Sequence, residues 1–383
     1  MADLAVLAGQ AVVDGQLTGP VTLTIADGRI ASIDPPRTEG VIDASAATVV
    51  PGLLDIHTHG GGGVQVIDGP AADMDRLARF YAAHGVTGFL ATIGGSREHI
   101  LAGLGAVRSY LAASPSGGAR CLGVHLEGPF ISPHALGAFR PESALAPDAE
   151  LFAEVLDAAG GHIRLMTIAP ELEGADAIIE RALAEGIACT IGHSVATLAQ
   201  VDHAVDIGAR SVTHFFNGMS PFRHREPGLI GAGLTDPRLV CELIVDGIHV
   251  HPRAVALAAV AKGIDGVALV TDSISAAGMP DGEYELEEQH VIISARSARL
   301  ADGTLAGSML TLERGVANFA EWAKVPLADA VRSATEVPAR VIGLSSTRGR
   351  ISQGRDADLT AFDSDHRLLW TMVGGALHEP AAA

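Results

Sequence analysis

The chain has 383 residues, of which 48% are hydrophobic and only 4% aromatic, and its length suits one α/β barrel of roughly 250 residues with an appended domain. A large core with few aromatic residues must be built from Ala, Val, Leu and Ile, which is typical of parallel strands covered by helices. The formal net charge of −19 argues against nucleic acid or an anionic membrane surface as a partner.

The first 48 residues predict short strands of a small domain. Residues 3–13 and 21–33 are strand-like, and the second stretch turns at Asp27-Gly28, a dipeptide that favours a tight hairpin. We expect the partners of these strands at the other end of the chain.

A repeated pattern follows. From residue 49 to residue 273, an apolar strand-like run and then a helix-length segment recur about eight times, which is the sequence signature of a (β/α)8 barrel. The strand-like runs end near eight residues: His59, Gly94, Glu127, Pro170, His193, His214, His249 and Asp272. The connection over residues 218–238 is rich in Gly and Pro and predicts a long loop with a short helix. We place a catalytic TIM-like barrel at residues 49–345.

After the last barrel strand, a polar excursion over residues 279–303 predicts a hairpin, because Asp-Gly dipeptides flank a strand-like segment. Two helices are predicted next, at residues 308–323 and 326–336.

The C-terminal part of the chain again predicts short strands. Ile351, residues 359–362 and residues 368–373 are strand-like and are separated by polar turns. We expect them to join the N-terminal strands in one β-sandwich domain, formed by residues 1–48 and 346–383, with the barrel inserted between its halves.

Nothing in the sequence predicts export or a membrane. The N-terminus lacks a basic segment followed by an apolar one, and no uncharged run approaches the ~18 residues of a membrane span. Cys121, Cys189 and Cys241 are odd in number and widely spaced, so they predict core residues rather than disulfides or a zinc cluster. We expect a cytoplasmic protein.

His57 and His59 end the first buried strand, between Pro51-Gly52 and a glycine-rich loop. Residues i and i+2 point to the same face of a strand, so the two imidazoles can converge on one metal ion. The alternative is a pair of polar histidines in a surface loop.

Ionisable residues recur at the other strand ends, which in a barrel open onto one face. These residues are Glu127, His193, His214, His249 and Asp272. Neutral imidazoles and carboxylates are ligands that Zn2+ or Fe2+ prefers. A bound divalent ion lowers the pKa of water from 15.7 to about 7, and a nearby carboxylate can then move the proton. We assign this acid/base role to Asp272, for which the alternative is a helix N-cap.

With these motifs the chain resembles the N-acetylglucosamine-6-phosphate deacetylases of the amidohydrolase superfamily, over essentially its whole length. The resemblance rests on PGLLDIHTHG (51–60), HLEGPF (125–130), IGHS (191–194), THFFNGM (213–219), REPGLIGAG (225–233), VDGIHV (245–250), VTDS (270–273) and LAGS (305–308). The first and seventh motifs are shared widely across the superfamily, whereas HLEGPF with THFFNGM and DGIHV is more specific.

The resemblance implies that Glu127, His193 and His214 hold a metal and that Asp272 is the acid/base. It also implies a set of substrate-binding residues: Ala138, Asn217, Gly218, Arg225, His249, Leu305, Ala306 and Gly307. The implied reaction converts N-acetyl-D-glucosamine 6-phosphate to D-glucosamine 6-phosphate and acetate, in amino-sugar catabolism and cell-wall recycling. The family is dimeric, and Arg225 is expected to reach the neighbour's site.

The number of metal ions is left open by the resemblance, since some members lack the strand-1 histidines and use one ion. Here we predict two, because His57, His59 and Asp272 can hold a second ion with Glu127 as the bridge. Zn2+ or Fe2+ is expected, and Mn2+, Co2+ or Cd2+ can substitute.

One departure from the family pattern is visible, because Phe139 stands where the family has a histidine near the substrate. A phenyl ring cannot donate the hydrogen bond of an imidazole. Either Arg140 or His134 substitutes for it, or this loop binds differently. We assign His125 a structural or supporting role.

Two alternatives remain. One is another amidohydrolase acting on an amide, such as a cyclic amidase, although the carboxylated lysine that many of those use on strand 4 has no counterpart in residues 162–170. The other is a non-catalytic barrel homologue, which would be marked by loss of the acid/base, whereas Asp272 is present.

Overall fold

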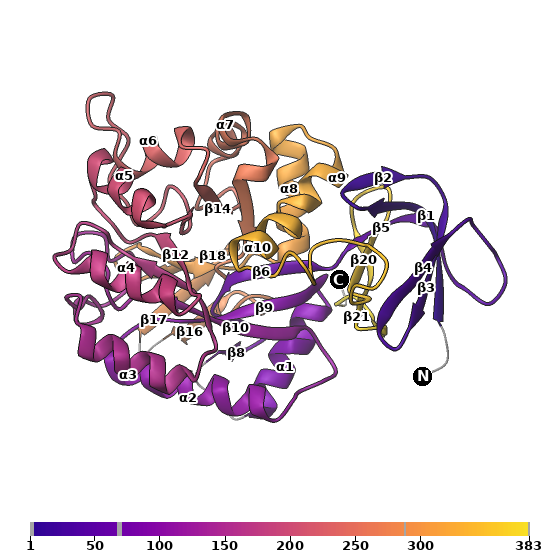
Figure 1. Cartoon of the computed structure of the whole chain (residues 1–383), viewed down its shortest axis with the longest axis horizontal. Helices are drawn as coiled ribbons and strands as arrows, with labels where there is room; N and C mark the ends of the chain where they lie inside the picture. Colours follow the sequence, from indigo (N-terminus) through magenta and orange to yellow (C-terminus); the bar gives the residue numbers. More distant parts are fainter. Residues whose placement is uncertain (1–3, 67–70, 287–288, 382–383) are drawn as a thin grey trace.

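The computed structural model describes residues 4–66, 71–286 and 289–381, so the first residue of the predicted strand at 3–13 lies outside it. Figure 1 shows a barrel wrapped by helices, with the strands of both chain ends side by side at its right. None of the described helices has the length and apolar character needed to cross a bilayer.

One eight-stranded sheet joins the two ends of the chain, in the order β22-β21-β20-β5-β1-β3-β4 with β2 paired to β1. Its strands are β1 Leu4–Val13, β2 Gln16–Thr18, β3 Val21–Ala26, β4 Arg29–Asp34, β5 Ile42–Pro51, β20 Leu359–Phe362, β21 Leu368–Val373 and β22 Ala376–His378. Asp27 and Gly28 link β3 to β4 with φ of 48° and 73°, as a tight hairpin requires. The pairing of β5 with β20 brings the two chain ends together, as expected, and β5 continues to Pro51.

The second sheet is the barrel, with eight parallel strands in the order β15-β14-β13-β12-β11-β10-β9-β6. They are β6 Leu53–Thr58, β9 Val86–Ile93, β10 Arg120–Glu127, β11 Ile163–Ile168, β12 Ala188–Ile191, β13 Ser211–Val212, β14 Val240–Ile244 and β15 Val267–Val270. The predicted (β/α)8 architecture is confirmed. The bounds proposed for the domains stay a prediction.

The seam between β15 and β6 brings the first and last strand ends together. The Asp272 N–H donates to the His57 carbonyl over 2.8 Å at the carboxyl end. At the other end, Leu54 N–H donates to the Ala334 carbonyl and Leu269 N–H to the Ser333 carbonyl, 2.8 Å each. The seam therefore places Asp272 beside His57 at the barrel mouth.

Helices cover the outside of the barrel and alternate with its strands. They are α1 Ala71–Ala82, α2 Arg97–Ala112, α3 Ala149–Ala159, α4 Ala175–Ala184, α5 Leu198–Ile207, α6 Gly228–Thr235, α7 Pro252–Lys262, α8 Leu312–Ala323, α9 Leu327–Arg332 and α10 Glu336–Val341. The helix predicted at 326–336 is interrupted, because α9 ends at Arg332 and α10 begins only at Glu336 and continues to Val341. Its interruption at Ser333 and Ala334 has a physical reason, since these two residues supply the carbonyls that fill the seam.

The polar excursion forms a four-stranded antiparallel sheet rather than the single hairpin expected. Its strands are β16 Gly282–Leu286, β17 Gln289–Ser294, β18 Ser297–Leu300 and β19 Leu305–Ser308. The Ser308 N–H donates to the Asp272 carbonyl over 2.7 Å, which fixes this sheet to the barrel mouth. A second small pairing joins β7 Gly60–Gly61 to β8 Val64–Gln65 in the glycine-rich loop.

Candidate metal centre and active site

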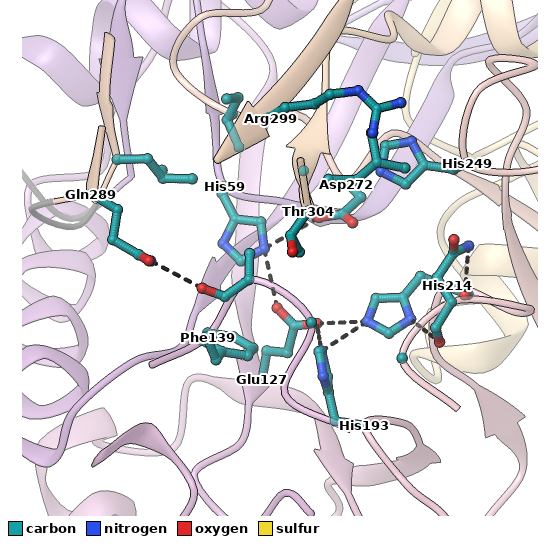
Figure 2. Close-up of a pocket in the computed structure, with 18 of the residues that line it drawn as sticks. His59, Glu127, Phe139, His193, His214, His249, Asp272, Gln289, Arg299 and Thr304 are labelled. Carbon is teal, nitrogen blue, oxygen red and sulfur yellow. Dashed lines mark hydrogen bonds and ion pairs between the residues drawn. The ribbon is translucent and has the colours of Figure 1, made fainter. Parts of the chain in front are cut away.

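A cavity of about 420 Å³ opens at the carboxyl ends of the barrel strands, beneath the four-stranded sheet (Figure 2). The predicted metal ligands His59, Glu127, His193, His214 and Asp272 line it. His57 lies behind them and is fully buried. The structure thus brings all six predicted ligands together at one place.

Three of these residues form a first ligand group, Glu127, His193 and His214. The Nε2 atoms of His193 and His214 each lie 3.2 Å from Glu127 Oε1, and they lie 2.9 Å from one another. Each Nδ1–H donates to a main-chain carbonyl, His193 to Ala135 over 2.8 Å and His214 to Asn217 over 3.1 Å. A neutral imidazole carries one hydrogen, so both Nε2 atoms present lone pairs. Lone pairs and a carboxylate at these distances fit a divalent cation between them.

The backbone directs these ligands into the mouth. His193, His214 and Asp272 are non-glycine residues in the left-handed region, with φ of 46°, 27° and 50°. Such backbone costs about 1–3 kcal/mol for each residue and is retained mainly at functional sites. The bend directly after β12, β13 and β15 turns each side chain back toward the barrel axis.

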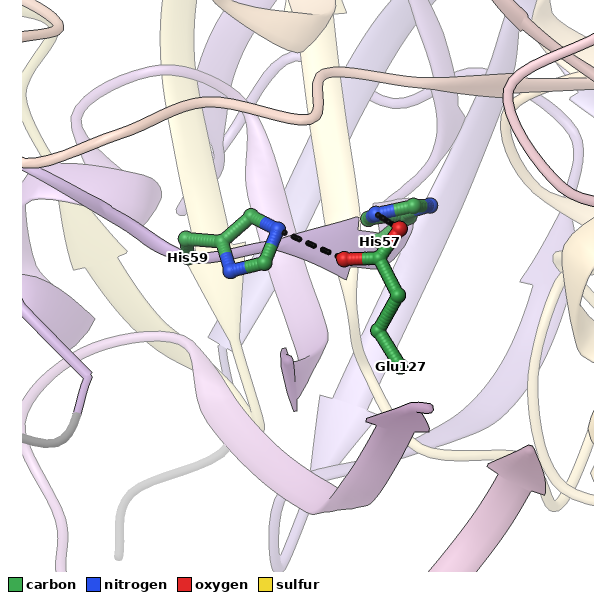
Figure 3. Close-up of side chains that lie close together, drawn as sticks. All are labelled: His57, His59 and Glu127. Atoms are coloured by element: carbon green, nitrogen blue, oxygen red, sulfur yellow. Dashed lines mark ion pairs between the residues drawn. The ribbon is translucent and has the colours of Figure 1, made fainter. Parts of the chain in front are cut away.

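A second ligand group consists of His57, His59 and Glu127 (Figure 3). Asp272 lies beside this group. His57 Nε2 lies 3.3 Å from Glu127 Oε1 and 3.5 Å from Asp272 Oδ1. His59 Nε2 lies 3.1 Å from Glu127 Oε2 and 3.3 Å from Asp272 Oδ1. Glu127 therefore faces both groups, one oxygen toward His193 and His214 and the other toward His59.

The electrostatics of the metal-free cluster show how closely these charges interact. Burial lowers the pKa of His59, but hydrogen bonds with Asp272 and Glu127 outweigh it and raise the pKa to about 9. Burial raises the pKa of Asp272, but the charge on His57 and the hydrogen bond with His59 hold it at about 2. Buried His57 Nε2 has no hydrogen-bond partner among the described residues, as expected of a metal ligand.

Glu242 was not predicted to belong to the site. It lies in the middle of β14, fully buried, and its Oε2 accepts a hydrogen bond from His57 Nδ1–H over 3.1 Å. The signal that could have found it is a charged residue inside the apolar run Val240-Cys241-Glu242-Leu243-Ile244.

His125 has the supporting place expected of it. Both ring nitrogens are engaged, Nε2 with Thr167 Oγ1 at 2.8 Å and Nδ1 with Thr92 Oγ1 at 3.3 Å. Its ring packs edge-on against His57 at a centroid distance of 4.5 Å.

Most of the predicted substrate-binding residues line the cavity: Ala138, Asn217, Gly218, His249, Leu305 and Gly307. Ala306 is buried outside its lining. Arg225 also lies outside the lining, on the exposed stretch 221–226. His249 is oriented by Asp246, whose Oδ2 accepts from His249 Nδ1–H over 2.7 Å.

The four-stranded sheet contributes cavity residues that the sequence did not predict. Arg299 from β18 and Gln289 from β17 line the cavity, and Figure 2 shows both reaching toward it. Gln289 Nε2–H donates to the Ala138 carbonyl over 3.0 Å, which links this sheet to the loop after β10.

Phe139 lines the cavity, and its ring packs edge-on against His193 at a centroid distance of 5.1 Å. A Cβ atom on Gly94 would lie 2.7 Å from this ring, so the glycine makes room for it. In the part of the chain that the structure describes, neither Arg140 nor His134 joins the cavity lining.

Comparison with known proteins decides the family. The family model described as "Amidohydrolase family" matches residues 48–378. The chain belongs to the amidohydrolase family. A relative of this amidohydrolase, the N-acetylglucosamine-6-phosphate deacetylase of Bacillus subtilis (strain 168), is 38% identical over 97% of this chain and 95% of its own. An N-acetylgalactosamine-6-phosphate deacetylase of Escherichia coli O157:H7 is 36% identical over 93% of this chain and 94% of its own.

Solved structures give the same family with the same fold. A mutant N-acetyl-D-glucosamine-6-phosphate deacetylase from Mycobacterium smegmatis, in complex with N-acetyl-D-glucosamine-6-phosphate, superposes on the amidohydrolase with a TM-score of 0.92. It is 33% identical and covers 99% of this chain and 100% of its own.

Proposed function

We propose that this amidohydrolase removes the acetyl group from N-acetyl-D-glucosamine 6-phosphate, giving D-glucosamine 6-phosphate and acetate. The observation that carries the proposal is the pair of ligand groups that share Glu127, with Asp272 beside them at the end of a sugar-sized cavity. The names of relatives that are 34–38% identical over most of the chain support the substrate.

A divalent metal fits the donor set, because four imidazoles and two carboxylates converge with their lone pairs facing one another. When bound, a divalent ion activates water and polarises the amide carbonyl. We propose two ions per subunit, one held by Glu127, His193 and His214, the other by His57, His59 and Asp272 with Glu127 between them. Zn2+ or Fe2+ suits these ligands, and Mn2+, Co2+ or Cd2+ can replace them.

Asp272 is the acid/base of this proposal. Its carboxyl is held ionised by His57 and His59, so it has a lone pair that can accept the proton of the attacking water. Since Asp272 lines the cavity, it can then deliver that proton to the departing amine nitrogen. His193 and His214, with Nδ1 fixed to carbonyls, hold their position during the reaction.

The phosphate needs local cations, because the chain carries a net charge of −19. Arg299 lines the cavity and offers guanidinium N–H donors for it. His249 also lines the cavity, but its Nδ1–H is already donated to Asp246. We propose that the chain is a homodimer in which Arg225 reaches the phosphate in the neighbour's site. The proposal is supported by Phe222, an apolar side chain that is 55% exposed on the same stretch as Arg225 and that a second copy would cover.

A second substrate has a specific observation in its favour. The Escherichia coli relative is named for N-acetylgalactosamine 6-phosphate, which differs from the glucosamine compound only in the configuration of one hydroxyl. We propose that the glucosamine compound is the better substrate of the two. The enzyme should be assayed on both sugar phosphates.

We place the reaction in amino-sugar catabolism and cell-wall recycling in the cytoplasm. Free cysteines at 121, 189 and 241 fit a reducing compartment.

The experiment is release of acetate, together with the free amine, from N-acetyl-D-glucosamine 6-phosphate by metal-loaded protein. An Asp272→Asn variant is the control for catalysis by the site. No acetate from either sugar phosphate, with release from another amide, would reassign the substrate. No turnover of any amide would indicate a non-catalytic homologue.

A further inference from the structure

Glu242 is an acidic residue in the interior of a barrel strand. It is fully buried, and so are its neighbours in β14, Cys241 and Leu243. A buried carboxylate is unfavourable unless it has strong partners. The groups that form hydrogen bonds with the Glu242 carboxylate therefore indicate its role.

Both hydrogen bonds to its side chain come from predicted metal ligands, one from each ligand group. Glu242 Oε2 accepts from His57 Nδ1–H over 3.1 Å and from the His214 main-chain N–H over 3.4 Å. The main-chain carbonyl of Glu242 also accepts from Phe215 N–H over 2.7 Å. One residue thus holds the His57 ring and the backbone that carries His214.

The hydrogen bond to His57 determines which atom the imidazole offers to a metal. With Nδ1–H donated to Glu242, the free nitrogen is Nε2, which faces Glu127 at 3.3 Å and Asp272 at 3.5 Å. A carboxylate behind a ligating histidine fixes the ring and raises its basicity, and removing such a partner typically lowers metal affinity about 10–100-fold. The bond to His214 is longer and reaches only its backbone, so its effect is smaller.

We propose that Glu242 is a positioning residue for the strand-1 metal ion, acting through His57, and that it links this ion to the one held by His193 and His214. The proposal rests on the two-ion site proposed above. Glu242 itself contacts neither the substrate nor the metal in this proposal. Replacing it should therefore lower metal occupancy, and any loss of turnover should follow from the lost metal.

The test compares the wild type with Glu242→Gln, which keeps the size of the side chain but removes its charge. Zinc per subunit is measured by elemental analysis after dialysis, and the two affinities by calorimetric titration of the metal-free protein with Zn2+. We expect the weaker equivalent of the variant to bind about 10–100-fold less tightly and the tighter one to change less than about threefold. Thr190→Val, a buried change in the same barrel that removes a hydrogen bond with Thr213, is the matched control and should bind both equivalents as the wild type does.

Two further measurements separate positioning from general destabilisation. Thermal unfolding of the metal-free variants reports folding, and the visible absorption of the Co2+-loaded protein reports the ligand geometry. A double variant, His57→Gln with Glu242→Gln, should match His57→Gln alone in stoichiometry, since Glu242 acts through His57. Two equivalents bound by Glu242→Gln with wild-type affinities would overturn the role of Glu242 and leave the two-ion site standing. A single equivalent in the wild type would overturn both.

Discussion

His193 and His214 present their Nε2 atoms to each other at 2.9 Å, while each Nδ1–H is donated to a main-chain carbonyl. When both rings are neutral, neither Nε2 atom carries a hydrogen, so the two atoms cannot form a hydrogen bond with each other. Both also face Glu127 Oε1, which is an acceptor as well. Their arrangement is favourable only with a cation between them. The barrel mouth is thus built for a metal before any substrate arrives.

Metal removal should therefore destabilise the protein. A ligand at 100 times its dissociation constant stabilises the folded state by about 2.7 kcal/mol, so a chelator should lower the Tm by several degrees. Differential scanning calorimetry with and without chelator checks this, and added Zn2+ should restore the Tm. A His193→Asn variant keeps only the ligands of the strand-1 ion, so it should show a smaller response to the chelator than the wild type. An equal response in wild type and variant would place the stabilising metal elsewhere.

The proton-transfer role proposed for Asp272 predicts a large effect on turnover. General acid/base groups contribute about 10²–10⁴-fold, so Asp272→Asn should lower kcat by that factor while KM changes much less. Steady-state kinetics on the sugar phosphate measure both constants. Asp302→Asn, in an exposed turn of the excursion, serves as the control and should behave as the wild type. A tenfold or smaller loss in Asp272→Asn would assign the proton transfer to another group.

The phosphate should contribute more to binding than the sugar does. Hydrogen bonds to charged groups are worth about 1.5–3 kcal/mol, so Arg225→Ala and Arg299→Ala should each raise KM for the phosphorylated sugar far more than for free N-acetylglucosamine. Arg296→Ala is a matched control, because Arg296 is exposed on the neighbouring turn and lies outside the cavity lining.

Mixing variant subunits distinguishes an arginine that acts in its own site from one that acts in the neighbour's site. If Arg225 acts in the neighbour's site, mixing Arg225→Ala with an Asp272→Asn subunit should restore part of the activity, because one of the two sites is then intact. Equal effects of either arginine on phosphorylated and free sugar would show that neither binds the phosphate.

Much of this site was predictable because its signals are local. Apolar runs of strand length with His or an acid directly after them identified Glu127, His193, His214 and Asp272, and parallel strands in a barrel bring such ends to one face. The His57 and His59 pair followed from the two-residue period of a strand.

The remaining parts depend on tertiary structure. Arg299 and Gln289 reach the cavity because the excursion folds over the barrel mouth, which its own composition does not encode. The residues between α9 and α10 accept hydrogen bonds from the main-chain N–H groups of Leu54 and Leu269, which are far away in sequence. Glu242 is different, since a charge inside an apolar strand was visible in the sequence but its partner His57 lies 185 residues away.

Phe139 should set a limit on activity that a histidine would relieve. It lines the cavity beside His193 but cannot donate a hydrogen bond. A single hydrogen bond has a net worth of about 0.5–1.5 kcal/mol, so Phe139→His should raise kcat/KM for the sugar phosphate about 2–10-fold. Phe139→Leu controls for loss of the aromatic ring alone. Unchanged kcat and KM in Phe139→His would show that this position makes no contact with the substrate.

Binding of the strand-1 metal should release protons and weaken as the pH falls. His59 has its pKa raised to about 9 in the metal-free protein, so its ring is protonated at pH 7, whereas a ligating imidazole must be neutral. The charges of Glu127 and Asp272 also raise the pKa of His57. Asp272, with a pKa of about 2, is already ionised and releases no proton. Below pH 9 the apparent affinity should therefore fall about tenfold per pH unit for each proton displaced, and increase toward higher pH until His59 is neutral.

Calorimetric titration with Zn2+ at pH 7, in two buffers of different ionisation enthalpy, counts the protons. In the His57→Gln, His59→Asn double variant about one metal equivalent per subunit should be lost together with this proton release. Two equivalents retained by the variant, or no proton released by the wild type, would show that these histidines hold no metal.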